Sequence, residues 1–198
     1  MSAPSRVWPG AAVREFLEWL GNTPWSVALL ESFYMWPLIE STHVLTLAVF
    51  VGTTTMMDLR LLGVTFKGVP VSAFTGRLLP WTRGSFAVMT VTGLLLFYSS
   101  PLGYYHNVFF RFKMLVLIVA GVNVWLFHSR IHRRIADWDL EWKPPRAARV
   151  AAVVSLMAWA SVVVSGRMIA YNWFDCDIQP QPDWVNWAAG CVLPPELR

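Results

Sequence analysis

The residue best suited to chemistry is His43, which lies in the segment Glu40-Ser-Thr-His43. This segment falls inside an apolar stretch from Trp36 to Met57 that is long enough to cross a bilayer. Ionisable side chains are rare at such depth, and they usually mark a ligand site, an ion pathway or a proton relay. His43 is therefore the first candidate for binding a metal or a haem iron.

Other polar residues can be placed by depth from the axial rise of an α-helix, about 1.5 Å per residue. His43 lies about 13 Å in from the outer end of its segment, and Gly93 on the next apolar segment lies at a similar depth. Lys113 and Arg167 lie only about 6 Å in from the outer ends of later segments. We therefore expect a haem b with His43 as axial ligand, propionates near the two cations, and Gly93 beneath the ring.

A second axial ligand is not evident. His128 lies roughly 15 Å deeper than His43, so one haem iron is not expected to bind both. His106 lies in an outer loop and would reach the iron only if that loop folded back into the bundle. Both are weaker candidates than His43, and a five-coordinate iron is an alternative.

Three other interpretations stay open. His43 fits a purely structural role, as a neutral histidine hydrogen-bonded to Glu40 or Thr46. A copper or proton pathway would use Glu40 and His43 without a porphyrin. An ion pair that joins the inner ends of two segments is expected among Asp58, Arg60 and Arg83.

The composition predicts the elements that must position these residues. Hydrophobic residues make up 56% of the chain and charged residues 14%, and the mean hydropathy is +0.46. These values exclude an ordinary soluble domain and predict an all-α integral membrane protein that lies in a lipid bilayer. The net charge of +4 is attributed to membrane topology, and no nucleic-acid partner is expected.

The hydropathy pattern predicts a four-transmembrane-helix bundle over residues 34–171. The spans are expected at about 34–57, 81–98, 109–129 and 147–171, with Pro80 in the first turn of the second. Residues 1–33 are expected to form two short helices on the outer surface, Ser5–Gly21 and Trp25–Met35. Residues 172–198 form an extracytoplasmic tail, in which a Cys176–Cys191 disulfide is expected.

The distribution of charge predicts the orientation. Two of the connections between spans are basic and should face the cytoplasm, which places both termini in the periplasm. The basic residues of these connections are Arg60, Lys67, Arg77, Arg83, Arg130, Arg133, Arg134, Lys143, Arg146 and Arg149.

Five short motifs carry a resemblance to a known type of protein. They are Trp36-Pro37-Leu-Ile-Glu40-Ser-Thr-His43-Val, Asp58-Leu-Arg-Leu-Leu-Gly63, Pro80-Trp81, Thr92-Gly93-Leu-Leu-Leu-Phe97 and Phe112-Lys113-Met-Leu. With these motifs the chain resembles an uncharacterised family of small multipass bacterial inner-membrane proteins. It is more distantly similar to HemJ-type protoporphyrinogen oxidases and CopD-type copper-resistance proteins. The HemJ resemblance implies a four-helix haem-binding core, with His43 and Lys113 at the positions of that family's functional histidine and lysine.

The expected function is that of a b-type haem-binding redox or electron-transfer subunit in a bacterial inner membrane. Its partners would be other membrane or periplasmic subunits. No nucleophile triad or phosphate-binding loop occurs in the sequence, and whether the chain is itself an enzyme stays open. The alternatives are a structural accessory subunit of a larger membrane complex and the copper or proton pathway.

Overall fold

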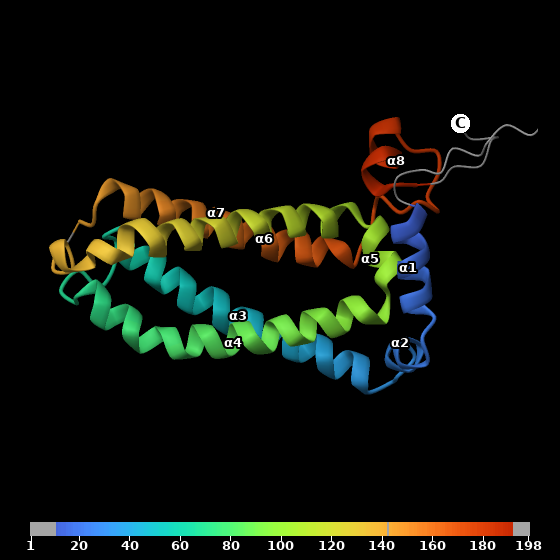
Figure 1. The fold of residues 1–198 in the computed structure, drawn as a ribbon, viewed down its shortest axis with the longest axis horizontal. Helices are drawn as coiled ribbons and strands as arrows, with labels where there is room; N and C mark the ends of the chain where they lie inside the picture. Colours follow the sequence, from blue (N-terminus) through green and yellow to red (C-terminus); the bar gives the residue numbers. More distant parts are fainter. Residues whose placement is uncertain (1–10, 142, 192–198) are drawn as a thin grey trace, which may run out of the picture.

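The computed structural model describes residues 11–141 and 143–191. Over these residues the regular secondary structure is all helical, with turns and loops between the helices. Four long helices run side by side and form an elongated bundle (Figure 1). They are α3 (Met35–Leu61), α4 (Val71–Ser99), α6 (Val108–Leu126) and α7 (Arg146–Ile169). The shorter elements are α1 (Ala11–Gly21), α2 (Pro24–Leu30), α5 (Pro101–His106), the π-helical turn η1 (Phe127–Ile131), the 3-10 helix η2 (His132–Asp137) and α8 (Asp183–Ala189).

Three of the long helices are long and apolar enough to span a membrane: α3, α7, and α6 together with η1. This is consistent with the membrane protein that the composition predicts. Among the described helices α4 does not meet the same criterion, although it has 29 residues. The reason lies in its sequence, because Arg77, Arg83 and several Ser, Thr and Gly residues lower its hydropathy.

The start of α4 differs from the sequence-based expectation. The helix begins at Val71, so Pro80 lies inside it and not in its first turn. Asp139 explains the earlier start, because its carboxylate accepts hydrogen bonds from the backbone N–H and the hydroxyl of Ser72, at 2.7 and 2.5 Å. These bonds satisfy donors at the helix N-terminus that have no partner within the helix.

The N-terminal helices lie across one end of the bundle (Figure 1). Pro24 occupies the first turn of α2 after Thr23, and the Thr23 side chain does not cap the helix. Instead its hydroxyl bonds to Leu20 O and to the Tyr98 hydroxyl. Ser26 is fully buried and donates to Tyr98 O at 2.7 Å. Side-chain hydrogen bonds thus hold α2 against the end of α4, and residues 5–10 of the predicted first helix lie outside the described residues.

The predicted disulfide is confirmed, and it staples the tail. Cys176 and Cys191 are joined across a separation of 15 residues that contains α8. Arg111 donates to Ala188 O at 2.8 Å, and the His106 ring nitrogen Nδ1 bonds to Ala189 O at 2.9 Å. Both bonds reach the C-terminal end of α8, so they dock the tail on α5 and α6.

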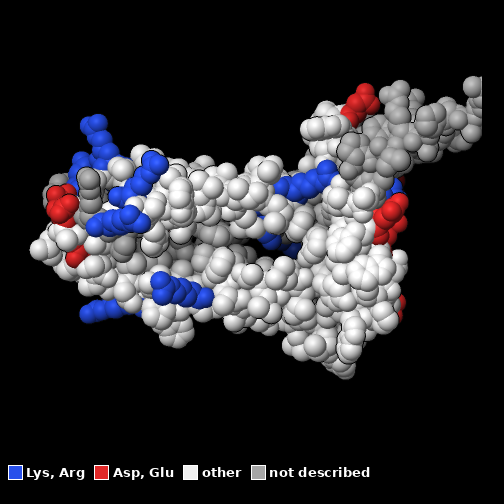
Figure 2. All heavy atoms as spheres, viewed as in Figure 1, with Lys and Arg blue, Asp and Glu red and all other residues white. Residues whose placement is uncertain are grey.

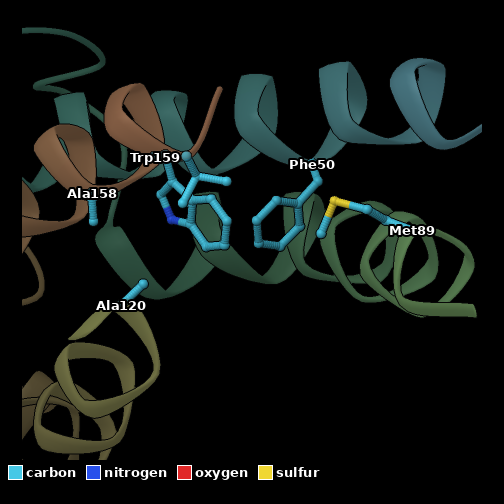
Figure 3. Close-up of a cluster of buried hydrophobic side chains, with 6 residues drawn as sticks. Phe50, Met89, Ala120, Ala158 and Trp159 are labelled. Atoms are coloured by element: carbon cyan, nitrogen blue, oxygen red, sulfur yellow. The ribbon is translucent and has the colours of Figure 1, made fainter. Parts of the chain in front are cut away.

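The bundle core contains a cluster of buried side chains from all four long helices. Phe50 of α3 and Trp159 of α7 meet edge to face, with ring centroids 4.6 Å apart (Figure 3). Met89 of α4 and Ala120 of α6 complete the contact from the other two helices. The edge-to-face geometry of Phe50 and Trp159 is favourable for aromatic pairs. It fixes α3 against α7 at the middle of the bundle.

Candidate functional site

A cavity of about 860 Å³ lies between the four long helices. The helices pack mainly as two pairs, α3 with α4 and α6 with α7, and these pairs meet where α3 contacts α7. Along the described helices, α4 and α6 make little contact with each other. Figure 2 shows the surface hollowed between them. The cavity therefore opens sideways, on the α4–α6 side, and its volume is typical of a ligand pocket.

His43 lines this cavity, and its ring is held by a residue of α4. His43 Nδ1 lies 3.0 Å from the Thr92 hydroxyl oxygen. Thr92 uses its own proton within its helix, where it donates to Val88 O at 2.8 Å or Met89 O at 3.1 Å. The Thr92 oxygen can then only accept from His43, so the proton of the neutral ring sits on Nδ1 and the lone pair on Nε2.

This arrangement is the one that metal-binding histidines generally have. A ligating histidine donates its second ring N–H to a neighbouring acceptor, which fixes the tautomer and the orientation of the ring. Thr92 supplies such an acceptor for His43. The contact also corrects the expected structural pairing, because Glu40 is exposed and the Thr46 hydroxyl bonds to backbone carbonyls, Thr42 O and His43 O.

Gly93 lies directly against the His43 ring, and both residues line the cavity. A Cβ atom at position 93 would lie 3.1 Å from His43 Cε1 and 3.6 Å from Nδ1. The first distance is shorter than an ordinary contact of about 3.5–4.0 Å between carbon atoms. The absence of a side chain at this position therefore lets the ring lie on the α4 backbone. Gly93 and His43 are thus in contact, whereas the position of Gly93 beneath a haem ring stays a prediction.

Lys113 of α6 also lines the cavity. Its Nζ lies near α7, since a Cβ at Gly166 would be 3.8 Å away. Its charge acts electrostatically on His43. The structure therefore brings His43, Gly93 and Lys113 to one end of one cavity.

Arg167 does not join this group. It is exposed, and its guanidinium donates to the Tyr171 hydroxyl at 3.1 Å and lies over the Tyr171 ring at 5.0 Å. The neighbouring Gly166 is the residue of α7 that faces Lys113. Arg167 therefore points toward Tyr171 and does not join His43 and Lys113 as expected.

The two other histidines with a proposed ligand role lie elsewhere. His106, on α5, contacts the docked tail, where its Nδ1 bonds to Ala189 O and lies 3.9 Å from Cys176 Sγ. His128 lines the cavity from η1, and its Nδ1 lies 3.0 Å from Val124 O. Neither residue is placed beside His43.

Glu40 lies at the end of the bundle near α5. Burial, followed by the nearby charge of Glu40, raises the pKa of the Tyr104 phenol above its ordinary value.

The expected ion pair at the other end of the bundle is wrong. Asp58, Arg60 and Arg83 all belong to the described residues, and no ion pair joins Asp58 to either arginine. Arg60 instead donates to Val69 O at 2.9 Å.

Two polar residues were missed by the sequence-based assignment: Thr92, which contacts the cavity-lining His43, and Asp58, which lines the cavity itself. Thr92 appears in the motif Thr92-Gly93, and the polar residue beside the glycine is the signal that could have found it. Asp58 was assigned to an ion pair, but it is buried and lines the cavity. Neither side-chain direction follows from depth alone.

The comparisons with known proteins place the chain in a family but give no activity. No curated protein and no solved structure matches it. The match of a family model covers residues 13–172, which includes α2 to α7 and nearly all of α1. The chain therefore belongs to a family of unknown function, DUF6644.

Proposed function

We propose that this protein binds haem b in the cavity through His43 and serves as a redox or electron-transfer subunit of the bacterial inner membrane. The observation that carries the proposal is the His43–Thr92 contact of 3.0 Å at the wall of a large apolar cavity. A porphyrin supplies four nitrogen ligands to its iron, so a single protein histidine is enough to hold it. When bound, haem supplies one-electron transfer.

The residues around His43 suit a flat apolar group with acidic substituents. Gly93 leaves room for the His43 ring against the α4 backbone, and Phe97 and Phe110 line the same end of the cavity. Lys113 provides a positive charge that a carboxylate can pair with. In this proposal Lys113 takes the role of propionate anchor, while Arg167 remains at the rim with Tyr171.

The proposal includes four membrane spans, with α4 as the fourth. At about 1.5 Å per residue, the 29 residues of α4 would extend about 43 Å, which exceeds the hydrocarbon thickness of about 30 Å. Lys and Arg side chains gather mainly at the end of the bundle formed by the α3–α4 connection, η1 and η2 (Figure 2). We assign this basic end to the cytoplasm. The disulfide-bonded tail would then lie in the oxidising periplasm, near other membrane or periplasmic subunits.

An absorption spectrum tests the haem proposal. The protein purified from cells supplied with a haem precursor should show a Soret band and reduced-minus-oxidised bands of a b-type haem. The His43→Ala variant should lose the band, and His106→Ala should keep it as the matched control. Thr92→Val should weaken haem binding by about 10- to 100-fold, as expected for a residue that orients a ligating histidine. A colourless protein, or full haem content in His43→Ala, would refute the proposal.

A further inference from the structure

The end of the cavity far from His43 contains a second polar group that the haem proposal does not use. Asp58 is 6% exposed and lines the cavity. Its Oδ2 atom is buried and has no hydrogen-bond partner within residues 11–141 and 143–191. A buried polar atom without a partner costs about 1–3 kcal/mol, so such an atom facing a cavity indicates a missing partner.

Asp58 has hydroxyl-bearing residues around it, and no ion pair is found for it among the described residues. Ser155 of α7 lines the same cavity as Asp58. Thr54 and Arg83 also line this end of the cavity. A carboxyl oxygen accepts a hydrogen bond when ionised and can donate one when protonated. The site therefore suits a neutral hydrogen-bonding group, whereas an unpaired carboxylate would repel an anion.

This end is separate from the His43 site. The two residues are 15 positions apart on α3 (58 − 43), which corresponds to about 22 Å along the helix axis. The cavity between them is lined by apolar and aromatic side chains, among them Phe50, Phe86 and Trp159. A ligand that bonds to Asp58 would thus occupy the inner half and leave the surroundings of His43 accessible.

The shape of the cavity identifies the class of ligand. Because it opens between α4 and α6, and because these helices would face lipid in a membrane, the ligand enters from the bilayer and must be apolar. Aromatic walls favour a flat ring, and the Asp58 carboxyl requires a hydrogen-bonding oxygen on it. We propose that the inner half of the cavity binds a membrane-soluble quinone or quinol, with a ring oxygen hydrogen-bonded to Asp58 and Ser155.

Binding of a decyl-substituted 1,4-benzoquinone tests this proposal. The full chain is placed in lipid nanodiscs and titrated by calorimetry, with empty nanodiscs subtracted to remove partition into lipid. We expect saturable binding of one molecule per chain. Decylbenzene has the same ring and tail without oxygens, and decanol has an oxygen and tail without the ring. Both should bind at least about tenfold more weakly, because decylbenzene has no oxygen that accepts a hydrogen bond and decanol has no ring that packs against the aromatic walls.

Two variants that remove a carboxyl group provide the matched comparison. Asp58→Ala removes every donor and acceptor of that side chain and should weaken quinone binding about tenfold or more, whereas Asp137→Ala, at an exposed acid of the same end that does not line the cavity, should leave it unchanged. Equal binding of decylbenzene or decanol, or unchanged binding by a folded Asp58→Ala variant, would overturn the proposal.

A crosslinking measurement keeps the proposal testable if Asp58→Ala does not fold. A benzoquinone with a photoreactive diazirine on its ring should label the wild-type helix turns around Asp58 and Ser155, as mapped by mass spectrometry. Labelling restricted to the His43 end would contradict the assignment. The result is independent of the haem proposal, because His43→Ala should lose haem and still bind the quinone, while Asp58→Ala should keep haem.

Discussion

The hydrogen bond between His43 and Thr92 can be tested without any cofactor. Thr92→Val replaces the hydroxyl by a methyl group of similar size, so the contact at 3.0 Å is lost while the packing is kept. The His43 Nδ1–H then loses the Thr92 hydroxyl as an acceptor. Because this bond joins α3 to α4, its loss should lower the stability of the bundle. Thr92→Ser keeps the hydroxyl and should restore most of the loss.

The magnitude follows from the setting of the bond. Hydrogen bonds between helices in membranes contribute about 0.6 kcal/mol on average and at most about 1.7 kcal/mol. His43 is half-buried, so we expect a coupling free energy of about 1 kcal/mol between His43 and Thr92. This corresponds to about a fivefold change in the unfolding equilibrium.

A double-mutant cycle isolates this free energy. The haem-free wild type, His43→Ala, Thr92→Val and the double variant are unfolded by sodium dodecyl sulfate in mixed micelles, and helix content is followed by circular dichroism. The control cycle replaces Thr92 by Thr90, whose hydroxyl bonds only to Phe86 O on its own helix. The assigned hydrogen bond is wrong if the His43–Thr92 coupling lies within about 0.3 kcal/mol of the control.

Three further predictions concern other parts of the chain. Gly93→Ala places a methyl group 3.1 Å from His43 Cε1, so haem affinity should fall several-fold and Gly93→Leu should abolish haem binding; unchanged Soret absorbance in Gly93→Leu would contradict this. Burial alone would raise the pKa of Asp139, but the hydrogen bonds from Ser72 hold this pKa below its ordinary value of about 3.9. The stability that Asp139 contributes should therefore be complete above about pH 4 and be lost as the pH falls further. The melting temperature of Asp139→Asn should depend less on pH in this range than that of the wild type. Reduction of the Cys176–Cys191 disulfide should destabilise the tail by about 3 kcal/mol, detected as faster proteolysis around α8 while the helices of the bundle stay protected.

Some of the site could be predicted from sequence because depth in a membrane helix is a one-dimensional quantity. Counting residues from the end of an apolar segment placed His43 and Gly93 at one level, and the structure has them in contact. The direction in which a side chain points around the helix axis is a second quantity, and it rotates by about 100° from one residue to the next. Gly166 faces Lys113, while its neighbour Arg167 turns to Tyr171.

By itself, the sequence determined the helical membrane character, three of the four spans that it predicted and the pairing of the two cysteines, because these follow from composition and from the few cysteines present. Only the tertiary structure decided that His43 is held by Thr92 and that Asp58 faces a cavity instead of an arginine. It also decided that α4 begins at Val71, where Asp139 from a distant part of the chain satisfies its first turn. The physical reason is the same in each case, since these contacts join helices whose relative rotation and separation depend on the packing of the whole bundle.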